Sequence, residues 1–117
     1  MTVPGRRAER LADQIRVEVA EMISAELKDP RIGFATVTGV DMSADLHHAR
    51  LSVSVLGGAD AREKSLDGLS SAAGYIRREL GRRLRLRRTP ELTFVLDHEA
   101  EDNERLEMFL QKLKNEH

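Results

Sequence analysis

Positively charged side chains that could bind phosphate are concentrated in one short stretch of this 117-residue chain. Seven of the 19 basic residues lie between positions 77 and 88, whereas the whole chain has a formal net charge of −1. This concentration is typical of a surface that binds a polyanion, most often a nucleic-acid backbone. All seven are arginines, whose planar guanidinium can bind one phosphate through two hydrogen bonds. The cluster consists of Arg77, Arg78, Arg82, Arg83, Arg85, Arg87 and Arg88.

The spacing of this cluster predicts an amphipathic helix with one basic face. At about 100° per residue, Leu80 and Leu84 fall on the same side as Ile76, so this side should pack against the protein. Arg77 and Arg83 border the two sides, and the last two arginines lie beyond the helix. Contacts from such side chains to phosphates give affinity and salt dependence, and specificity would come from the shape of folded RNA. Three arginines fall opposite the apolar side and should be the most exposed: Arg78, Arg82 and Arg85.

A second, smaller basic group near the N-terminus consists of Arg6, Arg7 and Arg10. We include these residues among the candidate RNA-binding side chains. The alternative is that they only solvate the first turn of a helix, because many surface charges contribute nothing measurable.

Small residues at positions 72–74 interrupt the helical pattern just before the arginine cluster. Gly74 and the nearby serines lower helix propensity, so the sequence predicts a kink at Ala72 and Gly74 that positions the arginine helix. A binding loop at the same two residues is the alternative hypothesis.

Nothing in the sequence points to catalysis. The absence of cysteine excludes disulfides, thiolate nucleophiles and sulfur-ligated zinc. His47 and His48 are adjacent, so they point to opposite faces of an extended chain and do not form a chelating pair. Acids between positions 97 and 107 lack the spacing of a calcium loop, and they fit the N-terminal turn of a helix or a surface that repels RNA. We therefore expect no enzyme activity, no cofactor and no metal.

Length and composition predict one domain over residues 1–117, with an aliphatic core. Only 3% of the residues are aromatic, which argues against a protein that stacks bases on rings. We expect a flexible tail at residues 1–5, a core at 6–97 and an acidic segment with a last helix at 98–117. No apolar run is long enough for a bilayer and no signal-peptide pattern begins the chain, so we expect a cytoplasmic monomer.

Hydrophobic periodicity predicts an α+β domain in which a three-stranded sheet has its helices on one face. The first helix should end before Asp29 and Pro30. In the first strand, Val37 should face the core and Val40 the opposite side. A short turn joins the first two strands into a hairpin, and Asp60 should cap the next helix. The predicted order is helix 6–27, strand 34–40, strand 49–55, helix 61–73, kink, helix 75–86, strand 92–96 and a last helix.

This order of elements resembles that of type II KH domains, which bind nucleic acid. A series of local motifs extends the resemblance across residues 6–113. In chain order they are Asp-Pro-Arg at 29–31, Thr-Val-Thr at 36–38, Ser-Ala-Asp-Leu at 43–46, Ala-Arg-Leu-Ser-Val at 49–53, Ala-Gly-Tyr-Ile-Arg at 73–77, Thr-Pro-Glu-Leu-Thr-Phe at 89–94 and Asp97. Together these residues resemble the ribosome-binding factor A family of bacterial ribosome assembly proteins.

The resemblance implies a non-catalytic factor that binds the free small ribosomal subunit, assists late maturation of its rRNA and matters most in the cold. It also implies an Ala-x-Gly kink between the central helices, which matches residues 72–74. Ordinary KH domains carry a Gly-x-x-Gly loop there, and this chain has none, so side-chain charge should provide more of the binding. Two other hypotheses are a general KH-type binder of single-stranded RNA and a protein–protein module for an acidic partner, with a metal-dependent nuclease a more distant third.

Overall fold

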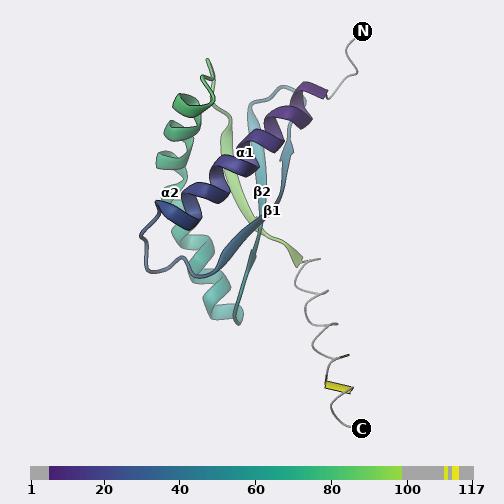
Figure 1. Cartoon of the computed structure of the whole chain (residues 1–117), viewed down its shortest axis with the longest axis vertical. Coiled ribbons are helices and arrows are strands. Elements are labelled where there is room, and N and C mark those ends of the chain that lie inside the picture. Colours follow the sequence, from purple (N-terminus) through teal and green to yellow (C-terminus); the bar gives the residue numbers. More distant parts are fainter. Residues whose placement is uncertain (1–5, 99–109, 111, 114–117) are drawn as a thin grey trace.

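The computed structural model describes residues 6–98, 110, 112 and 113. The predicted N-terminal tail and almost all of the predicted last helix lie outside these residues. Two helices and three strands make up the described domain (Figure 1). In chain order they are α1 (Arg6–Ala25), β1 (Ala35–Met42), β2 (His48–Val55), α2 (Ala59–Arg83) and β3 (Glu91–Leu96). This architecture confirms the predicted α+β fold.

Helix α1 forms because its apolar residues recur every three or four positions and make one continuous stripe. Ile15, Val19 and Met22 from this stripe are fully buried against the sheet. The helix ends slightly before its predicted limit. The backbone N–H groups of both Glu26 and Leu27 bond to the Met22 carbonyl, so the regular helical hydrogen bonding stops there.

The sheet has the order β1-β2-β3, with β2 in the centre. The predicted hairpin is confirmed, since β1 and β2 pair antiparallel, and β3 pairs parallel to β2 with His48 opposite Glu91. Strand β2 alternates as predicted: its apolar side chains are buried and those between them are not. The buried faces of the three strands form one core with α1 and α2, which contact the sheet mainly at β1 and β3 respectively.

A β-bulge in β1 changes which of its side chains face the core. Val37 lies opposite Val53, but Gly39 lies opposite Ser52, so Thr38 is an extra residue in the strand. An extra residue shifts the alternation by one position. The prediction that Val40 lies on the face opposite to Val37 is therefore wrong, and Val40 packs against the core.

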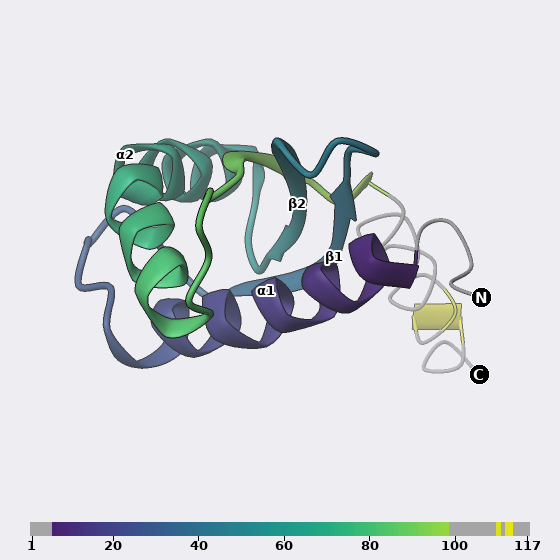
Figure 2. The same cartoon turned by 90° about the horizontal axis from the view of Figure 1, so that it is seen from above.

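Helix α2 differs from its prediction in three respects. It is one uninterrupted α-helix rather than two, although its two ends run in different directions (Figure 2). It begins at Ala59 with Gly58 in the N-cap position, so Asp60 lies in the first turn and is not the cap. It ends at Arg83, and Leu84 is its C-cap.

A glycine in the middle of α2 allows the segment before β1 to approach closely. A Cβ at Gly68 would lie 2.6 Å from Cγ1 of Ile32, which is too close for any real side chain. The neighbouring Ser65 is buried, and its hydroxyl accepts a hydrogen bond of 3.0 Å from the Gly33 N–H. Gly68 and Ser65 lower the helix propensity of α2, but they allow the segment at Ile32 and Gly33 to pack against this helix.

Candidate nucleic-acid interface

The arginines predicted to contact RNA differ in how far their charge is already compensated within the protein. Arg78, Arg82 and Arg85 are exposed as predicted, but so are Arg77, Arg87 and Arg88. Of the ten candidate arginines, two form ion pairs with carboxylates, one is hydrogen bonded to a backbone carbonyl, one contacts a histidine ring, and six have no partner among the described residues. These six are Arg6, Arg7, Arg10, Arg78, Arg85 and Arg87.

Arg83 lies between α1 and α2 and is surrounded by carboxylates. Its guanidinium is 2.5 Å from Glu26, 3.4 Å from Glu18 and 3.3 Å from Glu79, and only 18% of its side chain is exposed. The hydrogen bond to Glu26 is the main cause that raises the pKa of Arg83 above its ordinary value. These ion pairs join the two helices through Arg83 and already compensate its charge, so an RNA contact from this residue stays a prediction.

Arg82 also forms an ion pair, but at the surface. Its guanidinium donates to Glu79 at 2.9 Å, and 70% of its side chain is exposed. The hydrogen bond from Arg82 is the main cause that lowers the pKa of Glu79, and contact with the same carboxylate raises the pKa of Arg82. Any other anion that binds Arg82 would therefore compete with Glu79 for its guanidinium.

Arg77 stabilises the connection between α2 and β3. Its guanidinium donates two hydrogen bonds to the Thr89 carbonyl, at 2.9 and 3.3 Å. A Cβ at Gly81 would lie 2.7 Å from Oγ1 of Thr89, so this glycine lets the connection approach the helix. The next residue, Pro90, is fully buried. Together these contacts hold the loop that carries the last arginines of the cluster against α2.

Arg85 is not on the helix, contrary to the prediction that it shares a face with Arg78 and Arg82. It follows the C-cap and has a φ of 52°, in the left-handed region. The Leu86 N–H bonds to the Gly81 carbonyl at 3.0 Å, which is the long hydrogen bond of a Schellman C-cap. Glycine is usual at this position because a Cβ there is strained. The strained backbone directs the chain after Arg85 away from the helix axis.

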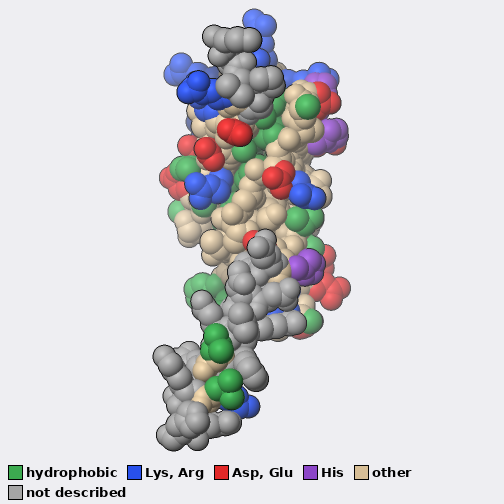
Figure 3. All heavy atoms as spheres, turned by 90° about the vertical axis from the view of Figure 1, so that its right-hand side faces the viewer, with side chains coloured by type: hydrophobic (Ala, Val, Ile, Leu, Met, Phe, Trp, Pro, Cys, Tyr) green, Lys and Arg blue, Asp and Glu red, His purple; other side chains and the backbone are tan. Residues whose placement is uncertain are grey.

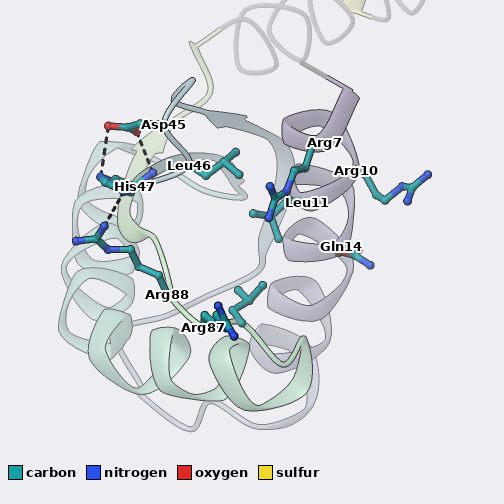
Figure 4. A pocket seen from close by; sticks show the side chains of 10 residues that line it. Arg7, Arg10, Leu11, Gln14, Asp45, Leu46, His47, Arg87 and Arg88 are labelled. Carbon is teal, nitrogen blue, oxygen red and sulfur yellow. Dashed lines mark hydrogen bonds and ion pairs between the residues drawn. The ribbon is translucent and has the colours of Figure 1, made fainter. Parts of the chain in front are cut away.

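The structure brings together the two basic groups that lie far apart in the sequence. The first turns of α1, the β1–β2 turn and the α2–β3 connection surround one groove of about 520 Å³, which we call the basic groove. Its arginines are Arg7 and Arg10 from the N-terminal group and Arg87 and Arg88 from the cluster. The side chains of Arg7 and Arg87 lie at the groove, whereas Arg10 and Gln14 point away from it (Figure 4).

One wall of the basic groove is a chain of polar contacts between side chains. Nη1 of Arg88 is 2.9 Å from Nε2 of His47, and Nδ1 of His47 is 3.4 Å from Oδ2 of Asp45 (Figure 4). Asp45 also accepts hydrogen bonds from the Ser43 hydroxyl at 2.6 Å and from the His47 N–H. The bond from Ser43 is the main cause that lowers the pKa of Asp45. This network orients Arg88 at the side of the groove.

Backbone pairing holds the β1–β2 turn against the start of β3. The Glu91 N–H donates to the His47 carbonyl at 2.8 Å.

In a space-filling view of one face, Lys and Arg side chains gather at the end of the molecule near the start of α1, close to histidines, whereas both signs of charge mix farther along (Figure 3). On this face, basic side chains therefore gather at the end of the domain where the groove lies (Figure 3).

The predicted kink residues have a different environment from that of the basic groove. A Cβ at Gly74 would meet nothing within 4 Å, so this glycine does not permit a close contact in the way that Gly68 does. A shallow hollow of about 260 Å³ lies beside Ala73, Gly74 and Arg77, next to the start of β3. A role for Ala72 and Gly74 in directing the arginine helix stays a prediction.

Sequence reasoning missed the uncharged part of the basic groove. Leu11, Leu46 and Leu86 line it together with His47, and none of these was a candidate. The sequence offers one weak indication of this apolar part: Leu46 lies in a predicted turn and Leu86 lies among arginines, and neither place needs an apolar side chain. Among the described residues no group of three His, Asp or Glu side chains could hold a metal, and no described helix has the length and apolarity to span a bilayer.

Comparison with known proteins gives consistent matches over most of the chain. The family model described as ribosome-binding factor A matches residues 7–110. The crystal structure of ribosome-binding factor A from Thermus thermophilus is 34% identical, with a TM-score of 0.66, over 75% of this chain and 93% of that one. The NMR structure of a Thermotoga maritima protein, proposed as a ribosome-binding factor A, is 31% identical with a TM-score of 0.70, over 81% and 91% of the two chains.

A third similar structure is a homology model of Thermus thermophilus ribosome-binding factor A, as fitted into the cryo-EM map of a 30S complex with that protein. It is 34% identical to this chain, with a TM-score of 0.61, over 72% of this chain and 88% of that one.

Proposed function

The chain belongs to the ribosome-binding factor A family, and we propose that it binds the free small ribosomal subunit in the cytoplasm and assists late maturation of its rRNA without catalysing a reaction. The family match agrees with the resemblance seen in the sequence. The fitted Thermus thermophilus relative, which lies in a 30S complex, supports the small subunit as the partner.

The observation that carries this proposal is the basic groove together with the unpaired arginines around it. Arg7 and Arg87 come from segments far apart in the sequence and line the same groove, and neither forms an ion pair with a described acid; the one acid in the lining, Asp45, bonds instead to Ser43 and His47. A phosphate backbone is the ligand that compensates several such guanidinium groups at once. Arg85 and Arg78 extend the positive surface along the end of α2, and Arg77 and Arg83 maintain the structure beneath it.

Arginine contacts of this kind bind the backbone and do not read the sequence. Selectivity for the small subunit would therefore come from the shape of folded rRNA, which places phosphates at the spacing of the groove. The chain has no Gly-x-x-Gly loop to clamp single-stranded nucleotides at residues 72–74, which favours structured rRNA over short single strands.

The test is co-sedimentation of the purified full chain with free small subunits, large subunits and whole ribosomes, each at two salt concentrations. We expect selective, salt-sensitive binding to free small subunits. Equal binding to all three particles would indicate generic attraction to polyanions and contradict the proposal. No binding to any of them, together with a complex that survives nuclease in a pull-down, would indicate an acidic protein partner instead.

A variant set separates the roles of the arginines. Changing Arg78, Arg85 and Arg87 to Gln removes three unpaired charges, and we expect this triple variant to lose most small-subunit binding while it stays folded. The matched comparison within the cluster is Arg78→Gln against Arg82→Gln, each of which removes one charge; the Arg82 variant should have the smaller effect, because its charge is already shared with Glu79. Equal losses in both variants would contradict the assignment.

A further inference from the structure

The basic groove contains an apolar surface that phosphate binding does not require. Leu46 and Leu86 are half-buried and line the groove, yet they are not among the side chains that pack against the hydrophobic core. Leu11 also lines the groove and packs against the core, so three leucines together give the groove an apolar floor. A surface built only for phosphate would gain nothing from these side chains, because apolar area binds apolar area.

Leu46 is held in a backbone conformation that disfavours leucine. Its φ is 63°, in the left-handed region, where glycine and asparagine are the residues usually found. The turn keeps this conformation through a hydrogen bond of 3.0 Å from the Leu46 N–H to the Ser43 carbonyl. A strained residue that places an apolar side chain in a groove outside the core indicates a binding role for that side chain.

Charge surrounds this apolar floor on more than one side. Arg7 and Arg87 are at the groove and have no partner among the described residues, and Arg88 is oriented at its wall by His47 (Figure 4). The groove therefore combines an apolar floor with guanidinium groups that can bind a phosphate or stack on a planar ring. Its volume of about 520 Å³ lies within the range of sites for small ligands.

We propose that the basic groove binds one unstacked nucleotide of an RNA strand, with its base on Leu11, Leu46 and Leu86 and its phosphate between Arg7 and Arg87. This inference rests on the proposed function, because it specifies how the same surface contacts rRNA. It adds a point at which a single base leaves its stack and enters the protein, as is common where proteins recognise loops and bulges of RNA.

The first test is an NMR titration of the isotope-labelled full chain with adenosine 5′-monophosphate and, separately, with ribose 5-phosphate. Both probes carry the phosphate, but only the first carries a base. We expect adenosine 5′-monophosphate to bind at least about tenfold more tightly and to shift the amide signals of Leu46, Leu86 and Arg87. Equal affinity for the two probes, or shifts confined to other surfaces, would overturn the inference.

The variant Leu46→Asn separates a binding role from a structural one. Asparagine tolerates the left-handed conformation, so the melting temperature should not fall, while affinity for adenosine 5′-monophosphate should drop about fivefold and affinity for ribose 5-phosphate less than twofold. Leu56→Asn is the matched control, since Leu56 is 61% exposed and does not line the groove. Leu86→Gln is a second variant with the same expected selective loss.

The outcome for the groove can be distinguished from the outcome for the proposed function. If wild-type protein co-sediments with small subunits and Leu46→Asn changes neither this binding nor the nucleotide titration, the inference fails and the proposed function stands. If the wild type fails to co-sediment, the proposed function fails whatever the titration shows. Retained nucleotide selectivity in both Leu46→Asn and Leu86→Gln would also overturn the inference.

Discussion

Removing two charges from the basic groove should change the salt dependence of binding by a calculable amount. The perturbation is the double variant Arg7→Gln and Arg87→Gln. Both side chains lie at the groove and neither has a partner among the described residues, so each can neutralise one phosphate (Figure 4). Glutamine keeps much of the side-chain length and polarity while removing the charge.

The magnitude follows from the release of counterions. Each neutralised phosphate contributes about 0.7 to 0.9 to the slope of the logarithm of affinity against the logarithm of salt concentration, so the double variant should lose about 1.4 to 1.8 of slope. Between roughly 50 and 200 mM salt, this difference makes the advantage of the wild type about 7- to 12-fold larger at the lower concentration.

The assay is equilibrium binding of fluorescently labelled protein to purified free small subunits at four or more salt concentrations. A matched control is the double variant Arg16→Gln and Lys28→Gln, which makes the same change in net charge. Both control residues are exposed and neither lines the groove. We expect the control to have a slope within about 0.3 of the wild type, because charges away from the contact release few counterions.

Equal slopes for the wild type and the groove variant would refute the reasoning, even if the affinity fell. The two arginines would then act through something other than phosphate contact. Equal loss of slope in the two double variants would also refute it, since net charge rather than the groove would govern binding. Circular dichroism of each variant checks that the fold is retained.

Three further predictions concern stability. Arg83→Met should lower the melting temperature more than Arg82→Met, because it leaves three half-buried carboxylates without their shared cation; equal shifts in thermal unfolding would contradict this. Arg85→Gly should raise the free energy of unfolding by about 1 kcal/mol in urea titrations, since it relieves left-handed strain, and a decrease would argue against that strain. Hydrogen bonds from the Arg31 side chain lower the pKa of Asp29 to about 2. The ion pair between these two residues should therefore stabilise the fold fully above about pH 4, and this stabilisation should disappear as the pH falls through 2. If NMR shows that the Asp29 carboxyl titrates near its ordinary pKa, the result would be inconsistent with the ion pair.

Local periodicity predicted those parts of the fold in which burial repeats regularly. The apolar stripe of α1 and the alternation of β2 were visible because each has one buried face along its whole length. The bulge at Thr38 could not be predicted, because one extra residue changes which side chains of β1 face the core without changing the composition of the strand. The end of α2 was also misjudged, because Leu84 and Leu86 continue the apolar pattern and no glycine or proline marks the left-handed residue between them.

The candidate site was predicted as a list of residues but not as an arrangement. Charge clustering identified the arginines, yet two of the three acidic partners of Arg83 lie 57 and 65 residues away along the chain, so only its pair with Glu79 could be seen from spacing. The basic groove likewise needs three separate segments to meet. Tertiary contacts decide which charges remain available, and only the structure supplies those contacts.

The parallel pairing of β2 with β3 constrains the order in which the chain can fold. The β1–β2 hairpin closes across a short turn, whereas β3 reaches β2 only after the whole of α2 has been made and has folded back. Pairings between distant segments form late because loop closure costs entropy before any contact is gained. The central strand therefore keeps one unpaired edge until residues 91–96 have been synthesised. The loop before β3 also forms part of the basic groove, so the groove is completed only in the same late step that protects this edge from aggregation.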